Sequence, residues 1–354
     1  MTVTNDFLVY AQGGSANVES QASYAADPLL PIGNQPGVAV SAFNNKAIRQ
    51  ANAVTSQIAQ FIANKTLANV NDDANPTKLL AQMFAAFDYK KPVVTSFLTP
   101  GTFTYNPAYK FQIASGNATA GATYSDGTTT FTVVNTIAAG LELVATGNAA
   151  PVVSGTLTKA TGTGDASIVF FAVRAPLYGR LRMVGAGGSG AGGGGSVGNG
   201  NNGGNSSFGT IVADGGSGGT DGGGNGGAVS GVTGSIAVTG GAGGSGGNNS
   251  SSTAYPVGGQ GGSSMFGGGG ASGKAANNGG NGANNTGGGG GGGAGLNVAT
   301  DAGGGGGGAG GAIDIIIYPS SETVIVGLGG SAGSSATAGG NGGSGFVELT
   351  LYFQ

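Results

Sequence analysis

The chain of 354 residues contains neither cysteine nor histidine, and both absences restrict what it can do. Without cysteine it can form no disulfide framework and no thiolate metal site. Without histidine it lacks the usual general base and the commonest metal ligand, and a Ser-His-Asp triad is impossible. We therefore expect a protein that is not an enzyme and that holds no metal or cofactor.

Charge is also scarce, because charged residues make up 8% of the chain and the formal net charge is −3. The 12 lysines and arginines are scattered, which leaves no basic surface for nucleic acid. The N-terminal MTVTNDFLVYAQ lacks a secretory signal pattern, and no apolar run approaches the roughly 18 to 20 residues of a membrane span. We expect a soluble chain that binds no nucleic acid and enters no membrane.

Glycine is the residue in excess, since all but 14 of the 81 glycines lie between residues 185 and 345. Glycine runs normally mark flexible linkers. Here, however, runs at 287–293 and 303–308 lead into a strand-like segment at 313–318. The other strands expected around the tract are 181–184, 323–327 and 346–353, with a hairpin across 319–322. Strands at both ends predict an ordered tract.

An ordered glycine tract could consist of polyproline-II-like segments that hydrogen-bond laterally, because residues without side chains let backbones approach closely. Interior positions must then be glycine, while Asn, Ser, Thr, Ala and Asp face outward. Collagen is excluded, since the tract has neither glycine at every third position nor abundant proline. The alternative interpretation is a flexible low-complexity tract.

The N-terminal part is expected to contain an extended arm and two helices. Residues 1–37 carry glycines and prolines that forbid a long helix. An apolar stripe then recurs at helical spacing, formed by Ala47, Ala51, Val54, Ile58 and Phe61. This stripe could pack within the chain or against copies of itself. The segment NPTKLLAQMFAAF predicts a second helix, with Asn75 as its cap and Pro76 in its first turn.

A small β module of sandwich type is expected after Pro92. The turn Asp126-Gly127 predicts a two-residue hairpin in which both residues have positive φ. The other expected strands are 93–97, 103–105, 109–113, 141–145, 151–157 and 167–173.

Two motifs in the chain resemble chemical sites. The segment GGGGASGKA matches a phosphate loop at Gly268, Gly273 and Lys274, but Ala275 replaces the magnesium-binding Ser or Thr. In a tract so rich in glycine we interpret this match as chance. The acidic pair Asp72-Asp73 precedes the second helix, where a solvated helix approach is the expected role.

Large side chains stand out within the glycine tract as possible binding contacts. Phe208 is followed by Thr-Ile-Val, which favours a structural role. Tyr255, Met265 and Phe266 have no strand beside them, so that a structural plug and a binding contact both remain open. Together with Lys274 they form the candidate contact set.

Three parts of the chain resemble tailed-bacteriophage tail-fibre and receptor-binding proteins. The segments TNDFLVYAQGGSANVESQASYAADP, FNNKAIRQANAVTSQIAQFIANKT and NDDANPTKLLAQMFAAF, within residues 4–87, look like an attachment region shared by many such proteins. Residues 121–170 are similar to a small β module of phage tail proteins. The segments PGTFTYNPAY, LRMVGAGGSGAGGGG and GGNGGSGFVELTLYFQ look like glycine-rich fibre-tip domains.

The resemblance implies a virion arm at 1–37, a helical trimerisation region at 38–91, first tip strands at 92–110, a β module at 111–172 and a glycine-rich tip at 173–354. The first strand and the V-G-G-G-G strand lie close together in the resembled domains but are about 70 residues apart here, so we infer that the β module is inserted within the tip domain. It also implies a homotrimer in the phage tail, assembled in the host cytoplasm. The N-terminal region would dock on other tail proteins, and the tip would bind a bacterial surface glycan or outer-membrane protein. The alternatives are a purely structural connector or spacer, an ice-binding protein and, least favoured, a glycan-cleaving spike.

Overall fold

The computed structural model describes residues 6–11, 13, 15–33, 40–66, 69–72, 76–88, 92–135, 142–152, 154–232, 236–248, 255–296 and 300–353. The chain divides into two compact units. Unit 1 comprises residues 1–91 and 108–175, together with residue 354, and unit 2 comprises 92–107 and 176–353. Most regular structure is β, with few helices, as the sequence predicted.

Four helices lie in the N-terminal part of unit 1, namely α1 (Gln21–Ala26), α2 (Leu29–Ile32), α3 (Ser41–Thr66) and α4 (Pro76–Asp88). The two longer helices confirm the spacing argument. The expectation of a wholly extended arm was wrong, because α1 and α2 form there. The hydroxyl of Ser20 accepts a hydrogen bond from the Ser23 backbone N–H at 3.0 Å and caps α1. The predicted cap Asn75 lies outside the described residues.

Helix α3 has one covered face and one open face. Ala59, Ile62 and Ala63 are buried in a cluster with Val70 and Ala86. On the other face, Val54, Ile58 and Phe61 are 62%, 45% and 38% exposed. The predicted apolar stripe therefore stays largely exposed in the single chain, although the Phe61 ring contacts Phe87 of α4.

The β module of unit 1 is a closed six-stranded barrel in the order β3, β6, β5, β4, β7, β8. Its strands are β3 (Ala108–Ser115), β4 (Thr123–Ser125), β5 (Thr130–Val133), β6 (Glu142–Gly147), β7 (Gly155–Thr161) and β8 (Ser167–Arg174). The predicted sandwich was wrong, because β3 pairs with both β6 and β8 and leaves no open edge. Phe111, Phe131 and Phe170 fill the interior, with edge-to-face ring centroids 5.1 to 5.3 Å apart.

Two local predictions in the barrel need correction. Strand β7 lies four residues later than expected, since it begins at Gly155. Between β4 and β5 the pairing ends at Ser125 and Thr130, so the turn has four residues, not two. Gly127 has φ of 98°, whereas Asp126 is not among the positive-φ residues. The Asp126 carboxylate instead accepts hydrogen bonds from the backbone N–H groups of Thr128 and Thr129 at 2.9 and 2.8 Å, and this side-chain turn replaces the expected one.

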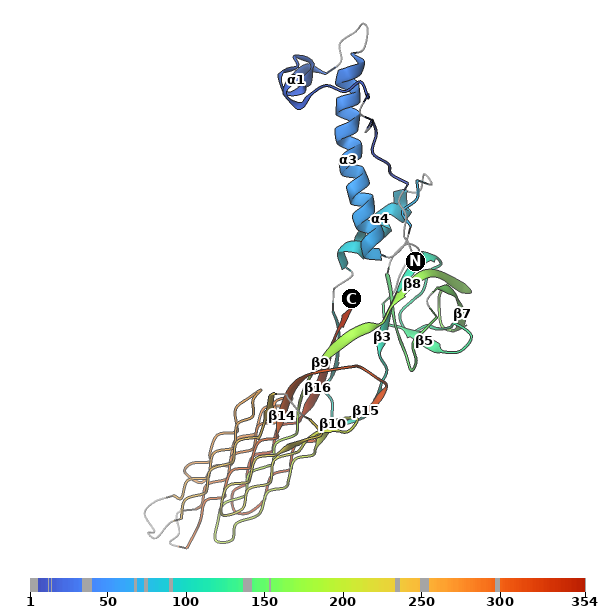
Figure 1. Cartoon of the computed structure of the whole chain (residues 1–354). Coiled ribbons are helices and arrows are strands. Elements are labelled where there is room, and N and C mark those ends of the chain that lie inside the picture. Colours follow the sequence, from blue (N-terminus) through green and yellow to red (C-terminus); the bar gives the residue numbers. More distant parts are fainter. Residues whose placement is uncertain are drawn as a thin grey trace. The chain divides into compact units, whose positions relative to one another are not determined.

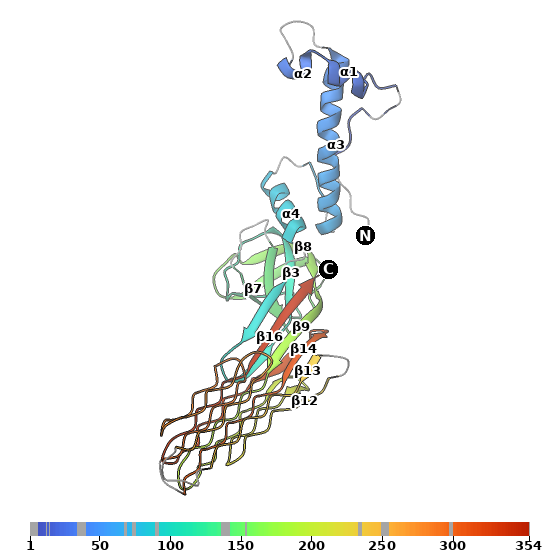
Figure 2. The same ribbon diagram turned by 90° about the vertical axis from the view of Figure 1, so that its left-hand side faces the viewer.

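Unit 2 contains two five-stranded antiparallel sheets (Figures 1 and 2). The first has the order β1 (Val93–Phe97), β16 (Phe346–Phe353), β9 (Pro176–Val184), β14 (Ala312–Ile317), β13 (Ile236–Val238). The second has the order β12 (Val229–Ser230), β11 (Ile211–Ala213), β10 (Ser206–Phe208), β15 (Glu322–Val326), β2 (Gly101–Tyr105). Strand β16 contacts β10 and β15 of the second sheet.

The sheet topology shows how distant segments meet. Strands β1 and β9 both pair with β16, one on each side, although the whole barrel separates them in the sequence. The hairpin predicted across residues 319–322 was wrong, because β14 belongs to the first sheet and β15 to the second. Strand β14 pairs with β9 and strand β15 pairs with β2, although β14 and β15 are neighbours in the sequence.

The glycine tract is an ordered lattice of extended segments that run side by side away from the strands (Figure 1). Residues 185–194 continue directly from β9, and their backbone N–H groups donate in turn to three other segments. The acceptors repeat every third residue: 311, 308 and 305 in one segment, 204, 201 and 198 in another, and 343, 340 and 337 in a third. Three residues per turn is the repeat of a polyproline II helix.

Residues 185–194 also accept hydrogen bonds on their other sides. The donors come from segments 216–219, 290–293 and 330–333, so that six neighbours surround the segment. Residues 287–295 and 303–311 are surrounded in the same way and are bonded to each other and to 185–194. All three, named the inner segments below, are buried throughout. The long glycine runs of the sequence are therefore the inner segments of the lattice.

Glycine is required in this lattice because a Cβ atom has no room. A Cβ on Gly307 would overlap the carbonyl oxygen of Gly188, and one on Gly290 would overlap that of Gly340. Freedom of φ is not the reason. Among the described residues of the tract, glycine φ is positive only at Gly194, Gly209, Gly231 and Gly287. Close lateral packing of peptide groups thus takes the place of a hydrophobic core.

Asparagines complete the hydrogen bonding of outer segments. Asn199, Asn202 and Asn205 are exposed at every third position. The side-chain oxygens of Asn202 and Asn205 accept from the backbone N–H groups of Gly218 and Gly215 at 2.8 and 2.9 Å. Outward positions can therefore carry side chains, as the sequence predicted, and some of these side chains bond to the next segment.

Candidate binding surface

The lattice has two ends, which we call the sheet end and the distal end. The sheet end adjoins β9 and β14, where the inner segments 185–194 and 303–311 join these strands. The distal end lies where residues 192–194 pair with residues 198, 302 and 337. An end is where chain turns occur, and turns can carry larger side chains than the packed segments can.

Exposed large side chains gather at the distal end. Tyr255, Val257 and Leu296 are 45%, 44% and 37% exposed. The backbone places them near one another, because the Gly295 N–H donates to the Pro256 carbonyl at 2.9 Å. We call Tyr255, Val257, Leu296 and Lys274 the distal cluster. Exposed apolar side chains that are grouped together are typical of a binding surface.

The chain around Leu296 is held in place by a buried carboxylate. Asp301 is 6% exposed, and its Oδ2 accepts a hydrogen bond from the Leu296 N–H at 2.9 Å. On the other side, Pro256 is buried beside Gly295. The backbone that carries Tyr255 and Leu296 is therefore anchored to the lattice, which lowers the entropy that these side chains lose on binding.

Lys274 lies at the same end, because the Gly258 N–H donates to the carbonyl of Gly273, the residue before Lys274, at 3.0 Å. Its side chain is exposed. The phosphate-loop interpretation fails on geometry. The residues after Lys274 form a turn and no helix, and Ala275 and Ala276 have φ of 51° and 63°. Lys274 is thus an exposed cation in a turn that does not have the geometry of a nucleotide-binding loop.

Met265 and Phe266 lie at the sheet end, far along the lattice from Tyr255. The Phe266 ring packs edge-to-face on Phe346 with centroids 5.0 Å apart, and the Arg182 guanidinium carbon lies 5.0 Å from its centroid. Phe266 therefore contributes to packing against β16. Met265 is 45% exposed. The four predicted contacts are thus divided between the two ends.

Phe208 has the structural role that the sequence favoured. It is 4% exposed in β10, and its ring lies 5.2 Å from that of Tyr105 in β2. Val257 and Leu296 were missed by the sequence analysis. The signal that could have identified them is their apolar character, since Val257 directly follows Pro256 and Leu296 stands three residues after the glycine run 287–293.

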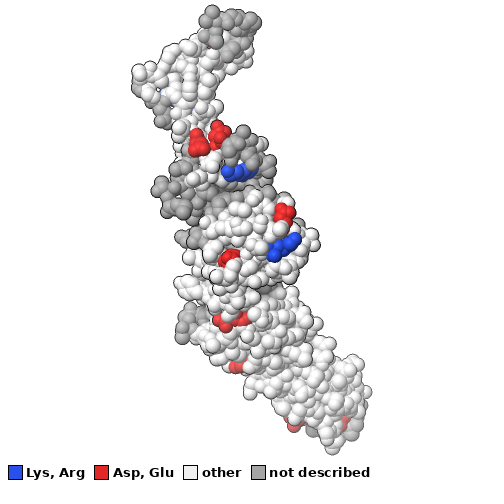
Figure 3. Space-filling model, turned by 90° about the vertical axis from the view of Figure 1, so that its right-hand side faces the viewer, with Lys and Arg blue, Asp and Glu red and all other residues white. Residues whose placement is uncertain are grey.

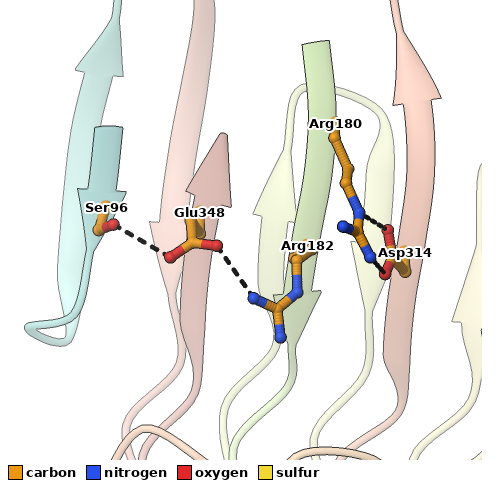
Figure 4. A network of polar contacts seen from close by, with 5 residues as sticks. All are labelled: Ser96, Arg180, Arg182, Asp314 and Glu348. Carbon is orange, nitrogen blue, oxygen red and sulfur yellow. Dashed lines mark hydrogen bonds and ion pairs between the residues drawn. The ribbon is translucent and has the colours of Figure 1, made fainter. Parts of the chain in front are cut away.

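The outer face of the first sheet carries a row of paired charges (Figure 4). Arg180 donates to both carboxylate oxygens of Asp314 at 2.8 and 2.6 Å. Arg182 donates to Glu348 at 3.1 Å, and Ser96 donates to the other oxygen of Glu348 at 3.4 Å. The hydrogen bonds from Arg180 hold the pKa of Asp314 below its ordinary value, against the opposing effect of partial burial. Because these charges are paired with one another, they do not form a site for an ionic ligand.

Elsewhere charge is sparse, as one face of the molecule shows (Figure 3). Asp72, of the predicted acidic pair, is exposed, and its partner Asp73 lies outside the described residues. Within the described ranges, no cluster of three or more acidic residues has the geometry of a metal site. None of the described helices is both long and apolar enough to cross a membrane.

A second apolar surface lies between α3 and α4. An open groove is lined by Ala53, Val54, Gln57, Ile58, Phe61, Ile62, Met83 and Phe87. Phe61 and Phe87 approach with ring centroids 5.6 Å apart. Of the predicted interface residues, Val54, Ile58 and Phe61 line this groove, while Ala51 is exposed and Ala47 half-buried further along α3.

Comparison with known proteins found no family model that matches the chain and no curated protein that is similar to it.

Proposed function

We propose that the chain is a bacteriophage tail-fibre or tail-tip protein that binds a host cell-surface receptor through its glycine-rich unit. The observation that carries this proposal is the distal cluster, a group of exposed large side chains at the far end of a lattice in which almost every other side chain is small. A spacer would have no need for such a group. The resemblance of residues 4–87 to a tail attachment region supports a position on the virion.

The lattice explains how a small contact surface could bind usefully. Tyrosine offers large contact area with few rotatable bonds, and the apolar pair Val257 and Leu296 adds area that becomes desolvated on binding. Lys274 supplies a donor for a carboxylate, phosphate or carbonyl group. Such chemistry suits a bacterial surface glycan or a loop of an outer-membrane protein. The backbone beneath is already ordered, so that little entropy is lost in forming the surface.

Adsorption of phage particles tests the proposal. Particles that carry Tyr255→Ser together with Leu296→Ser should assemble normally but adsorb to host cells at least about tenfold more slowly, since two central contacts are removed. Met265→Ser is the matched control, because Met265 is equally exposed but lies at the sheet end. Normal adsorption of the double variant, or an equal loss in the control, would contradict a distal receptor surface.

We also propose that the protein is a homotrimer and that the α3–α4 groove receives α3 of a second copy. The groove is uncharged, and Val54, Ile58 and Phe61 leave large apolar area exposed in the single chain. Apolar residues at this spacing on a helix are those that a helical bundle buries. The trimer would place three distal clusters on one particle appendage and raise the effective affinity where receptors are close together.

Light scattering of the purified chain measures the assembly directly. Val54→Asp should convert the trimer into a single chain, because a carboxylate cannot be buried in an apolar interface without a partner. Asn64→Asp changes charge at an exposed α3 position outside the groove and should leave the trimer intact. A wild-type mass equal to that of one chain would contradict the trimer.

The alternative of a purely structural connector makes a different prediction. A connector would have its lattice covered by other tail proteins in the particle, and the distal variants would then disturb assembly and not adsorption. Imaging of the intact particle separates the two functions.

A further inference from the structure

Six Asn-Gly steps occur in the glycine lattice, at Asn199, Asn202, Asn225, Asn278, Asn281 and Asn341. This dipeptide is chemically labile in water. The backbone nitrogen of the glycine attacks the asparagine side-chain amide carbon and expels ammonia, and water opens the resulting succinimide to aspartate or isoaspartate. The reaction needs a glycine nitrogen that is free to lose its proton and a side chain that is free to approach it.

Five of the six glycine N–H groups are already donated to carbonyl oxygens of neighbouring segments. The acceptors are the carbonyls of residue 219 for Gly200, 216 for Gly203, 338 for Gly279, 341 for Gly282 and 330 for Gly342, at 2.8 to 2.9 Å. A nitrogen held in this way can attack only after the segment has locally opened. The lattice therefore suppresses the reaction by restraining the glycine nitrogen, which is the nucleophile.

At four of these steps the asparagine side chain is engaged as well. The side-chain oxygen of Asn202 accepts from the Gly218 N–H, and those of Asn278, Asn281 and Asn341 accept from the N–H groups of residues 338, 341 and 332, at 2.8 to 2.9 Å. Ring closure would have to break this second hydrogen bond. Both reacting groups are thus restrained.

Asn225 differs from the others. Its side chain is exposed, and among the described residues neither that side chain nor the Gly226 N–H has a hydrogen-bond partner. The flanking Gly224 and Gly227 both donate to the inner segment 303–311, and the Asn225 carbonyl accepts from the Ser217 N–H at 2.9 Å. Residue 225 therefore belongs to the ordered lattice, although its side chain is exposed. The lattice leaves this one step unprotected.

We propose that Asn225 is a site of spontaneous deamidation and that the lattice protects the other five Asn-Gly steps. The reaction consumes one water, releases one ammonia and adds one negative charge to an exposed edge of a chain that carries few charges. Isoaspartate also lengthens the backbone, which would displace the Gly227 N–H from the three-residue repeat. Deamidation would thus alter both the charge and the edge structure of the lattice with age.

Incubation of the full chain at mildly alkaline pH, followed by peptide mass spectrometry, tests the proposal. Aspartate and isoaspartate at residue 225 should accumulate at least about fivefold faster than at Asn202, Asn278, Asn281 or Asn341. A factor of about five corresponds to the free energy of breaking one hydrogen bond of about 1 kcal/mol. Asn199, whose side chain has no hydrogen-bond partner among the residues that the structure describes but whose following N–H is donated, should lie between. Equal rates at all six sites in the folded chain would overturn the proposal.

Two controls separate protection by the fold from local sequence effects. In denaturant all six sites should react at similar rates, because each is then an exposed Asn-Gly step. If residue 225 were also several-fold faster in denaturant, the lattice would not be the cause. Asn225→Gln, at an exposed position, should leave the lattice intact and abolish most of the early ammonia release.

Discussion

The barrel of unit 1 and the lattice of unit 2 exclude water from their interiors by opposite means. In the barrel, Phe111, Phe131 and Phe170 fill a space that the backbone only encloses. In the lattice the backbone itself fills the space, and even one Cβ on Gly307 would overlap a neighbouring carbonyl oxygen. Both arrangements leave the buried peptide groups hydrogen-bonded, which is the condition for burying them at all.

The barrel and the lattice should therefore respond differently to substitutions in their interiors. In the barrel core, truncation of a side chain leaves a cavity. In the lattice interior, no side chain can be added, because there is no room for a Cβ atom. The two regions also differ in sequence distance: strands paired in the barrel are at most 64 residues apart, as at Lys110 and Arg174, whereas Gly187 is bonded to Gly343, 156 residues away. The lattice therefore depends on the strands at its sheet end, which hold together segments that are distant in the sequence.

The largest effect should come from adding a methyl group to an inner segment. Gly307→Ala should destabilise unit 2 by at least about 3 kcal/mol, because the Cβ cannot fit without separating two segments. Amide exchange across the inner segments would measure the loss. Gly268→Ala is the control, since a Cβ there meets no atom within 4 Å and should change little. Equal tolerance of both variants would show that the inner segments are not closely packed.

Removal of a core ring should have a comparable effect on the barrel alone. Phe131→Ala, at a position with 0% exposure, should cost about 3 to 5 kcal/mol of barrel stability. Exchange of barrel amides should accelerate while residues 185–194 stay protected, since the two units have separate interiors. Loss of protection in both regions would indicate that they unfold together.

A smaller effect is expected where a side chain completes the lattice from outside. Asn202→Ala removes the acceptor of the Gly218 N–H and should cost about 1 kcal/mol or less, because water can replace it. Exchange at Gly218 would report the change. Asn199→Ala removes an exposed asparagine at the same repeat without a side-chain hydrogen bond in the described structure, and should have no measurable effect.

The smallest effect concerns acid. The pKa of Asp314 is lowered in the folded state by Arg180, so the ion pair contributes stability above the ordinary carboxyl pKa of about 3.9. That contribution is lost as the pH falls through the lowered folded-state pKa. Unfolding midpoints measured against pH should therefore fall less steeply in acid for Asp314→Asn than for the wild type. Identical slopes would mean that the pair is too screened to matter.

Much of the fold could be predicted from local patterns. The apolar spacing of α3 and α4, the strand at 93–97 and the closing strand at 346–353 depend on residues close together in the chain. The failed strand pairing has a non-local cause. The hairpin across 319–322 was inferred from adjacency, yet the partners of β14 and β15 come from residues more than 70 positions earlier. Local patterns carry no information about such partners.

The candidate site was predicted only in part for the same reason. Tyr255 and Met265 look alike in the sequence, because both are large side chains in a glycine tract. In the folded lattice, however, they lie at opposite ends. Val257 and Leu296 join Tyr255 only because Gly295 pairs with Pro256. The position of a large side chain in the lattice therefore decides whether it packs inside the protein or is exposed for binding.

By itself the sequence determined that the C-terminal unit must pack backbone against backbone, because a tract with so few large side chains has no other means of forming an interior. It also determined the three-residue rhythm of outward asparagines. Only the tertiary structure decided which segments are inner and which side chains reach the distal end. Glycine carries no side chain to specify a partner, so that choice depends on where the two sheets hold the chain.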